Sequence, residues 1–214
     1  MPTPSNPLFA RTREPQGSPA SGTLVMLHGY GAHEEDLLAL GEMLDPRLRS
    51  VGLRAPLPLP WGGFAWYSLV PRGSGIDFND DELYAAVAQV IELVEEIAKK
   101  DGKPPLLLGF SQGGAVALSL ALQRPELCRA VFALSAAPPR VPAGKSAPRE
   151  KIKMLPIFAA HGTQDQVLPI LLGRQTRAFL EEAGCSLDWR EYPMGHEVGN
   201  RELIDAREFL TRIG

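Results

Sequence analysis

Cysteine is scarce in this sequence, with Cys128 and Cys185 the only two among 214 residues. Each comes directly before a stretch that we expect to form a strand, so both are expected at the same edge of a sheet. We place them on strands that are not neighbours, too far apart for a disulfide bond. Two free thiols are typical of a reducing compartment, so the sequence predicts a cytoplasmic protein.

Long apolar runs, basic clusters and metal-binding motifs are also missing. No apolar stretch approaches the roughly 18 residues of a membrane-spanning helix. The first residues lack the charged start and apolar run of a signal peptide. The net charge is −3 and there is no basic run, so nucleic acid is not an expected partner. Neither H-x-x-x-H nor C-x-x-C occurs, so no metal and no other cofactor is expected.

The most informative stretch runs from residue 104 to residue 123. Residues 106–109 (LLLG) predict a short strand buried on both faces, and residues 114–124 predict a helix rich in Ala and Leu. Between them lies a G-x-S-x-G sequence, GFSQG, with Ser111 at its centre. A serine between a buried strand and a helix lies on a strained turn that holds its hydroxyl at the carboxyl edge of the sheet. Ser111 is therefore the candidate nucleophile.

Strands and helices alternate along the chain without a break in composition. This alternation predicts one doubly wound α/β domain over residues 23–214 with a mostly parallel sheet. A Pro- and Ser-rich tail at 1–22 is expected to be flexible. The expected strands are 23–27, about 51–53, 106–109, 130–134, 157–160 and 187–192, and the expected helices are 34–44, 80–100, 114–124, 169–183 and 201–213.

Residues 55–79 form the longest segment without a periodic pattern. The segment is rich in Pro and Gly and contains the aromatic residues Trp61, Phe64, Trp66 and Tyr67. Irregular segments of this length are usually lids or binding loops, whereas aromatic side chains also serve simply to pack a core. Both interpretations stay open on the sequence.

A nucleophilic serine needs a base to take its proton and a carboxylate to orient that base. Asp165 and His196 each follow an expected strand, at the sheet edge where open α/β sheets bind ligands. The order Ser111, Asp165, His196 is that of the α/β-hydrolase arrangement. We therefore expect Asp165 as the acid and His196 as the base.

Other histidines and acids compete for these two roles. His28 fits better beside the oxyanion loop, and His33 fits the start of a helix. His161 ends a strand and is expected to make structural hydrogen bonds at the base of the Asp165 loop. Asp188 lies within the last strand, and Glu197 adjoins the histidine too closely along the chain to reach around it easily.

Stabilisation of an oxyanion needs two preorganised donors. The backbone N–H of Gln112, the residue after the nucleophile, is one candidate. The second is an N–H from the loop at 28–31, where Tyr30 is the better candidate.

Four motifs in this order resemble the phospholipase/carboxylesterase family of small α/β-hydrolases: LHGYG at 27–31, GFSQGG at 109–114, HGTQDQV at 161–167 and GHE at 195–197. That family includes acyl-protein thioesterases and bacterial carboxylesterases, and the resemblance covers nearly all of 23–213. It implies a compact α/β-hydrolase without a large helical cap. It also implies a triad of Ser111, Asp165 and His196, with the Tyr30 and Gln112 amides as oxyanion hole.

The resemblance also carries expectations about the substrate. Residues 65–67 (AWY) are similar to the segment that lines the acyl pocket in this family. The thioesterase members carry an Asp after the second glycine of the first loop, where this chain has Ala32. This departure favours the bacterial carboxylesterase branch over the protein-depalmitoylating branch.

The sequence therefore predicts a serine hydrolase that cleaves carboxylic esters of short to medium acyl chains. The expected partner is a small-molecule ester, and the chain is expected to be a monomer or a homodimer. A lysophospholipase or acyl-protein thioesterase with the same triad is the alternative, and a non-catalytic binding protein of the same fold is less favoured. The residues expected to contact the substrate are Trp66, Tyr67, Phe110 and Val167.

Overall fold

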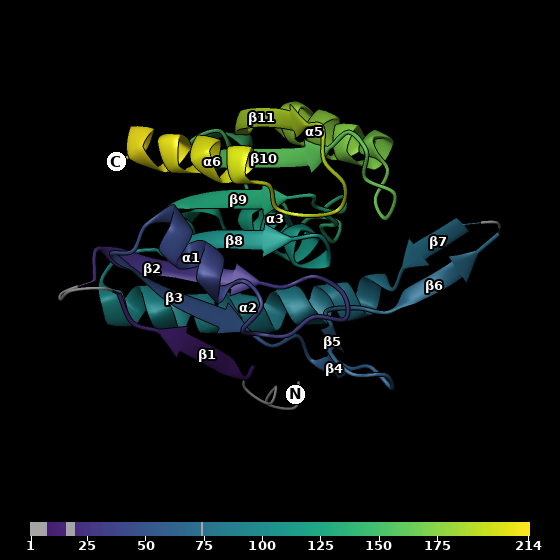
Figure 1. The fold of residues 1–214 in the computed structure, drawn as a ribbon, viewed down its shortest axis with the longest axis horizontal. Coiled ribbons are helices and arrows are strands. Elements are labelled where there is room, and N and C mark those ends of the chain that lie inside the picture. Colours follow the sequence, from purple (N-terminus) through teal and green to yellow (C-terminus); the bar gives the residue numbers. More distant parts are fainter. Residues whose placement is uncertain (1–7, 16–19, 74) are drawn as a thin grey trace.

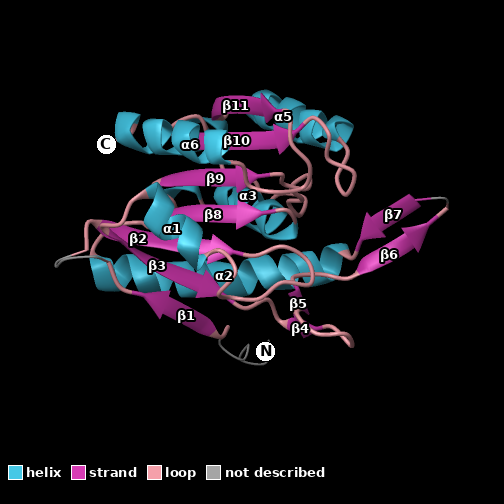
Figure 2. Ribbon diagram, in the orientation of Figure 1, coloured by secondary structure: helices cyan, strands magenta, loops and turns pink. Residues whose placement is uncertain are grey.

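The computed structural model describes residues 8–15, 20–73 and 75–214. Seven strands form one central sheet with helices on both faces (Figures 1 and 2). Neighbouring strands run parallel except at one edge, so the mostly parallel α/β fold is confirmed. In spatial order the strands are β1 (Ala10–Arg13), β3 (Leu48–Leu53), β2 (Gly22–Leu27), β8 (Leu106–Phe110), β9 (Ala130–Leu134), β10 (Pro156–Gly162) and β11 (Ser186–Tyr192).

Alternate residues of each central strand enter two different cores. Val25 and Leu27 pack on one face of β2, whereas Leu24 and Met26 pack on the other. Both faces are apolar because helices cover both, as is usual for a parallel sheet. The first core contains residues of α2 (Asp80–Asp101), α3 (Gln112–Gln123) and α5 (Ile170–Ala183). The second core lies beneath α1 (Leu38–Leu44) and α6 (Asn200–Arg212).

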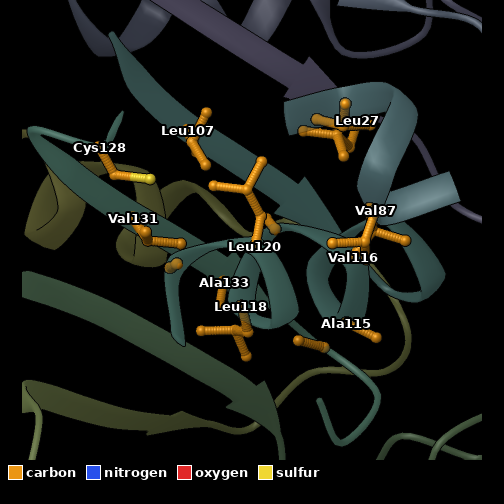
Figure 3. Packing of buried hydrophobic residues seen from close by; sticks show 14 of the residues in the cluster. Leu27, Val87, Leu107, Ala115, Val116, Leu118, Leu120, Cys128, Val131 and Ala133 are labelled. Atoms are coloured by element: carbon orange, nitrogen blue, oxygen red, sulfur yellow. The ribbon is translucent and has the colours of Figure 1, made fainter. Parts of the chain in front are cut away.

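Helix α3 is the most deeply buried helix of the fold. Every residue from Gln112 to Leu122 is buried, and Ala115, Val116, Leu118 and Leu120 lie among side chains of β2, β8, β9 and α2 (Figure 3). The many small alanines let this helix lie close to the sheet. The residues just before it are therefore held between two rigid elements.

The expectation of a flexible tail over residues 1–22 is wrong for residues 10–13. These residues form β1, which pairs antiparallel with β3, and Thr12 stands opposite Val51. The exposed edge of β3 offers backbone partners, and ion pairs from Arg11 to Glu35 and from Arg13 to Glu42 hold the strand there. Residues 1–7 and 16–19 lie outside the described residues.

The segment 55–79 is less irregular than its composition indicates. It contains one small ladder of β4 (Leu57–Pro58) and β5 (Phe64–Ala65) and a second of β6 (Leu69–Arg72) and β7 (Gly75–Phe78). The β6–β7 ribbon extends away from the body of the molecule (Figure 1). Helix α2 follows, and Asn79 is its N-cap, because the Asn79 side chain accepts a hydrogen bond from Glu82 N.

Other boundaries shift by a few residues. Helix α1 begins at Leu38 rather than at residue 34, because the acidic residues before it make turn and ion-pair contacts instead. Asp36 accepts a hydrogen bond from His33 N, and the buried Glu34 binds Arg54. The connection 138–153 ends in a short helix, α4 (Arg149–Ile152).

Cys128 and Cys185 are both free thiols, Cys128 buried and Cys185 half-buried. No described helix is long and apolar enough to cross a membrane.

Candidate active site

The turn between β8 and α3 holds Ser111 in an unusual backbone conformation. Its φ is 54° and its ψ is −117°, and Ser111 N donates to Leu134 O at 3.0 Å. The turn is sharp enough that a Cβ on Gly113 would lie 2.1 Å from Leu27 O. Only glycine fits there, so the second glycine of G-x-S-x-G follows from the close approach of α3 to the end of β2, and the first, Gly109, from its approach to Gly113 O.

Two hydrogen bonds join Ser111, His196 and Asp165. His196 Nε2 lies 2.9 Å from Ser111 Oγ, and His196 Nδ1 lies 2.6 Å from Asp165 Oδ2. A carboxylate only accepts hydrogen bonds, so Nδ1 carries the proton and Nε2 of the neutral ring is free to accept one from the serine. Ser111 and Asp165 are buried, and the His196 ring packs against Phe110 with centroids 4.8 Å apart.

The loop after β10 holds the Asp165 carboxylate in place. Its Oδ1 accepts hydrogen bonds from Val167 N at 2.9 Å and Leu168 N at 2.8 Å, which leaves Oδ2 directed at His196. The ring of His161 lies beside it, with Nε2 2.7 Å from Leu168 O and 3.5 Å from Asp165 Oδ2. His161 therefore stabilises this loop through its hydrogen bond to Leu168 O.

The other two competing histidines, His28 and His33, make different contacts. Both ring nitrogens of His28 are bound, since Nε2 accepts from Ala55 N at 3.1 Å and Nδ1 donates to Gly29 O at 2.7 Å. Burial lowers the pKa of His28, which matches this neutral state. At the surface, His33 Nε2 lies 3.0 Å from Asp36 Oδ1.

Neither competing acid makes a hydrogen bond to the His196 ring among the described residues, where Asp165 is its carboxylate partner. The Asp188 carboxylate on β11 accepts from Arg190 and Arg212, and these arginines lower its pKa although partial burial opposes them. Glu197 is exposed, and no described residue is paired with its carboxylate.

Gln112 and Tyr30 line the same cleft as Ser111, and their backbone N–H groups have no acceptor among the described residues. Gln112 is the first residue of α3, and N–H groups at a helix N-terminus have no intrahelical acceptor. In the loop after β2, Gly31 N donates to Phe64 O and Ala32 N donates to Gly29 O. No described residue accepts a hydrogen bond from Tyr30 N–H between them.

A cleft of about 1,080 Å³ opens above Ser111 and His196. Three of the residues expected to contact the substrate line it: Tyr67, Phe110 and Val167, the last 67% exposed at the rim. The rest of the wall is largely apolar. It includes Leu69, Phe78, Ala137, Pro138, Leu168 and Leu172.

The expectation that Trp66 lines this cleft is wrong. Its side chain is 0% exposed and does not belong to the wall. The indole N–H donates to His28 O at 2.8 Å, which turns the ring into the core beneath the oxyanion loop. Trp61, from the same aromatic segment, is 73% exposed and also lies outside the cleft.

Sequence reasoning also missed polar residues of the cleft. Arg140 and Asp77 line it and form an ion pair, with 2.9 Å between Arg140 Nη2 and Asp77 Oδ1. Gln175 from α5 also lines the cleft. Arg140 lies in the Pro-rich connection after β9, where no periodic pattern marks it. The side chain of Gln112 binds Trp66 N and Tyr67 O, a role that the G-x-S-x-G sequence does not predict.

The described part of the chain holds no group of three or more His, Cys, Asp or Glu side chains that could bind a metal ion.

Comparison with known proteins shows the family and the fold of the chain. The sequence model of the phospholipase/carboxylesterase family matches residues 11–213. Acyl-protein thioesterase 1 of Neurospora crassa is 37% identical over 213 residues, covering 89% of this chain and 86% of that protein. Carboxylesterase SOBER1 of Arabidopsis thaliana is 28% identical over 153 residues, covering 69% and 67%. A solved carboxylesterase structure from Mesorhizobium loti has a TM-score of 0.82 at 23% identity, over 98% of this chain and 97% of that one, and supports the fold alone.

The fold and the family together define a serine ester hydrolase with an α/β-hydrolase domain. The chain belongs to the phospholipase/carboxylesterase family.

Proposed function

We propose that this protein hydrolyses carboxylic esters through a triad of Ser111, His196 and Asp165. The proposal rests above all on the continuous hydrogen-bond chain, 2.9 Å from Ser111 Oγ to His196 Nε2 and 2.6 Å from His196 Nδ1 to Asp165 Oδ2. Both distances are within the reach needed for proton transfer and for orientation of the base.

The reaction follows from these positions. Ser111 Oγ attacks the ester carbonyl carbon while His196 Nε2 takes the hydroxyl proton. The tetrahedral intermediate collapses, and His196 gives that proton to the leaving alcohol. Water then attacks the acyl-enzyme, losing a proton to His196, and release of the acid returns the proton to Ser111. Asp165 stabilises the imidazolium form at each stage.

The Tyr30 and Gln112 N–H groups are the proposed oxyanion hole. Both lack an acceptor in the described part of the chain, as donors reserved for a ligand would. The N-terminus of α3 adds a favourable dipole at the developing negative charge.

The proposed substrate is an ester with a short to medium acyl chain. A cleft of about 1,080 Å³ is at the upper end of the range for small-molecule sites, and its largely apolar wall suits an alkyl chain. Thioester cleavage is the second candidate, because the Neurospora crassa relative is named an acyl-protein thioesterase. We also propose a cytoplasmic location, which the two free thiols favour.

Labelling and turnover test the proposal together. We expect a fluorophosphonate probe to modify Ser111, identified by peptide mass spectrometry, and labelled protein to lose hydrolysis of p-nitrophenyl butyrate. Heat-unfolded protein is the control for nonspecific labelling. Unimpaired hydrolysis by folded Ser111→Ala protein would exclude this site. Rates on butyryl oxoester and thioester pairs with matched leaving groups decide between the two candidates.

A further inference from the structure

Trp66 makes hydrogen bonds to both of the loops that flank Ser111. Its backbone N–H donates to Gln112 Oε1 at 2.7 Å, and its indole Nε1–H donates to His28 O at 2.8 Å. Gln112 carries one proposed oxyanion donor, and His28 lies two residues before Tyr30, which carries the other. One buried residue thus connects the two halves of the proposed oxyanion hole.

The side chain of Gln112 makes hydrogen bonds to the same segment, residues 66–67. Its Nε2 donates to Tyr67 O at 2.6 Å, so the side-chain amide binds the backbone on both sides of the Trp66–Tyr67 peptide bond. Gln112 is buried, and buried polar side chains are almost always hydrogen-bonded. The first turn of α3 is therefore fastened to this segment by two bonds.

The backbone just before Trp66 is paired with the Tyr30 loop. Gly31 N donates to Phe64 O, and Phe64 N donates to Ala32 O, both at 2.9 Å. The contact is close: a Cβ on Gly63 would lie 2.0 Å from Gly31 O. These contacts fasten the loop to residues 63 and 64, and Tyr30 N–H is the donor of the loop that has no acceptor among the described residues.

We propose that Trp66 is a positioning residue that sets the spacing between the Tyr30 and Gln112 N–H groups. The proposal rests on the proposed function, because it assigns a role to the machinery of that same site. The indole bond is the direct link from the segment to the carbonyl side of the Tyr30 loop. Its loss lets that loop relax relative to α3 while leaving Ser111 and His196 in contact.

The test removes the indole N–H and keeps an aromatic ring in place. Two changes do this: Trp66→Phe, and incorporation of benzothienylalanine, which replaces the N–H with sulfur in a bicyclic ring of nearly the same shape. We expect kcat on p-nitrophenyl butyrate to fall roughly 10- to 100-fold in both, the range for small misplacements of catalytic groups, with KM changed less than about twofold. A trifluoromethyl ketone, whose adduct with Ser111 places an oxyanion in the hole, should lose affinity by the same factor.

A control separates positioning from general stability. Phe158→Leu removes buried aromatic volume in the other core, where Phe158 packs against Phe132 and Phe209. It should lower the melting temperature as Trp66→Phe does and leave kcat within about twofold. The proposal is overturned if the benzothienylalanine protein keeps wild-type kcat and inhibitor affinity. It is also overturned if KM rises while kcat stays constant, since Trp66 would then act in substrate binding.

The outcomes for this inference and for the proposed function are distinct. If wild-type protein neither hydrolyses esters nor binds the trifluoromethyl ketone, the proposed function fails. If wild-type protein is active and Ser111→Ala is not, the proposed function stands, and the position-66 variants alone decide the role of Trp66.

Discussion

The backbone of Ser111 has a positive φ, which non-glycine residues rarely adopt, and hydrogen bonds to β9 and α3 hold it in this conformation. Ser111 N donates to Leu134 O of β9, and Ser111 O accepts from Gly114 N and Ala115 N of α3. None of these bonds uses the side chain. Removal of the hydroxyl should therefore leave the fold intact, so that losses of activity at this position report on chemistry.

Substitution of each triad member should disable the enzyme to a similar degree. Ser111→Ala, His196→Ala and Asp165→Asn should each lower kcat by on the order of 10³-fold or more, and the triple variant should lose little beyond that, because the three act as one unit. Steady-state hydrolysis of p-nitrophenyl butyrate, with circular dichroism to verify folding, checks this. Asp188→Asn is the matched control, since that carboxylate serves Arg190 and Arg212. Equal damage from Asp188→Asn and Asp165→Asn would show that the wrong acid has been assigned.

The two thiols should react slowly in the native protein. Burial raises the pKa of Cys128, and it raises the pKa of the half-buried Cys185 to about 11. Because the thiolate is the reactive form, a disulfide reagent such as dithionitrobenzoate at pH 8 should modify native protein at least tenfold more slowly than a model thiol. Both thiols should react promptly in denaturant. Rapid release of one equivalent from native protein would contradict the burial of these side chains.

Among the elements, the segment 55–79 shows where sequence reasoning reaches its limit. Its composition predicts aromatic residues at the site, and Tyr67 does line the cleft. Trp66, its neighbour, is buried in the same core but does not line the cleft, and nothing in the sequence distinguishes the two positions. The bridge between Ala32 and Phe64 and the hydrogen bonds of Trp66 to Gln112 and His28 hold this segment, and all of them join parts of the chain that are far apart in sequence.

Other elements were predictable because their signals are local. Strand β8, the turn at Ser111 and helix α3 are contiguous, so the G-x-S-x-G sequence predicts them together. Asp165 and His196 each follow a later strand of the chain. Because parallel strands bring their carboxyl ends to one edge of the sheet, the sequence predicted that these two side chains lie near Ser111. Strand β1 had no such signal: its ARTR sequence is exposed throughout and depends on the free edge of β3.

The start of α6 carries a buried acid next to the loop that holds His196. Glu202 Oε2 accepts a hydrogen bond from Gly199 N at 3.1 Å, whereas Oε1 is buried without a partner among the described residues. Burial raises the pKa of Glu202 to about 8, although the Gly199 hydrogen bond opposes this.

Stability should therefore fall as pH rises from about 4.5 to about 8. In that window the unfolded state releases a proton that the folded state keeps, so the folded state binds more protons, and the free energy of unfolding drops by at most about 1.4 kcal/mol per pH unit. Glu202→Gln removes this ionisation. Urea unfolding from pH 5 to pH 9 should show that the variant becomes more stable relative to wild type as pH rises. A pH-independent difference between the two proteins would refute this role of Glu202.

On the scale of the whole molecule, the cleft is assembled from elements far apart in the sequence. Leu69 and Phe78 come from the β6–β7 ribbon, Ala137 follows β9, and Leu168 and Leu172 come from the start of α5 and the loop before it. The sheet brings these together by placing the carboxyl ends of β2, β8, β9 and β10 along one edge. Acyl-chain preference is thus a property of the assembled domain.

The dependence of rate on acyl-chain length should report this assembled wall. Each CH₂ that fits should gain up to about 0.8 kcal/mol, a three- to fourfold rise in kcat/KM per carbon when the gain appears in the transition state. The rise should stop where the cleft ends, at a medium chain length. Leu172→Ala removes one wall residue and should flatten the rise from acetyl to octanoyl p-nitrophenyl esters, with acetyl turnover affected least. Leu171→Ala is the matched control, because Leu171 is 66% exposed and lies outside the cleft wall, and it should keep the wild-type slope. Equal losses on acetyl and octanoyl esters in Leu172→Ala would mean that α5 supports the fold and that the acyl chain lies elsewhere.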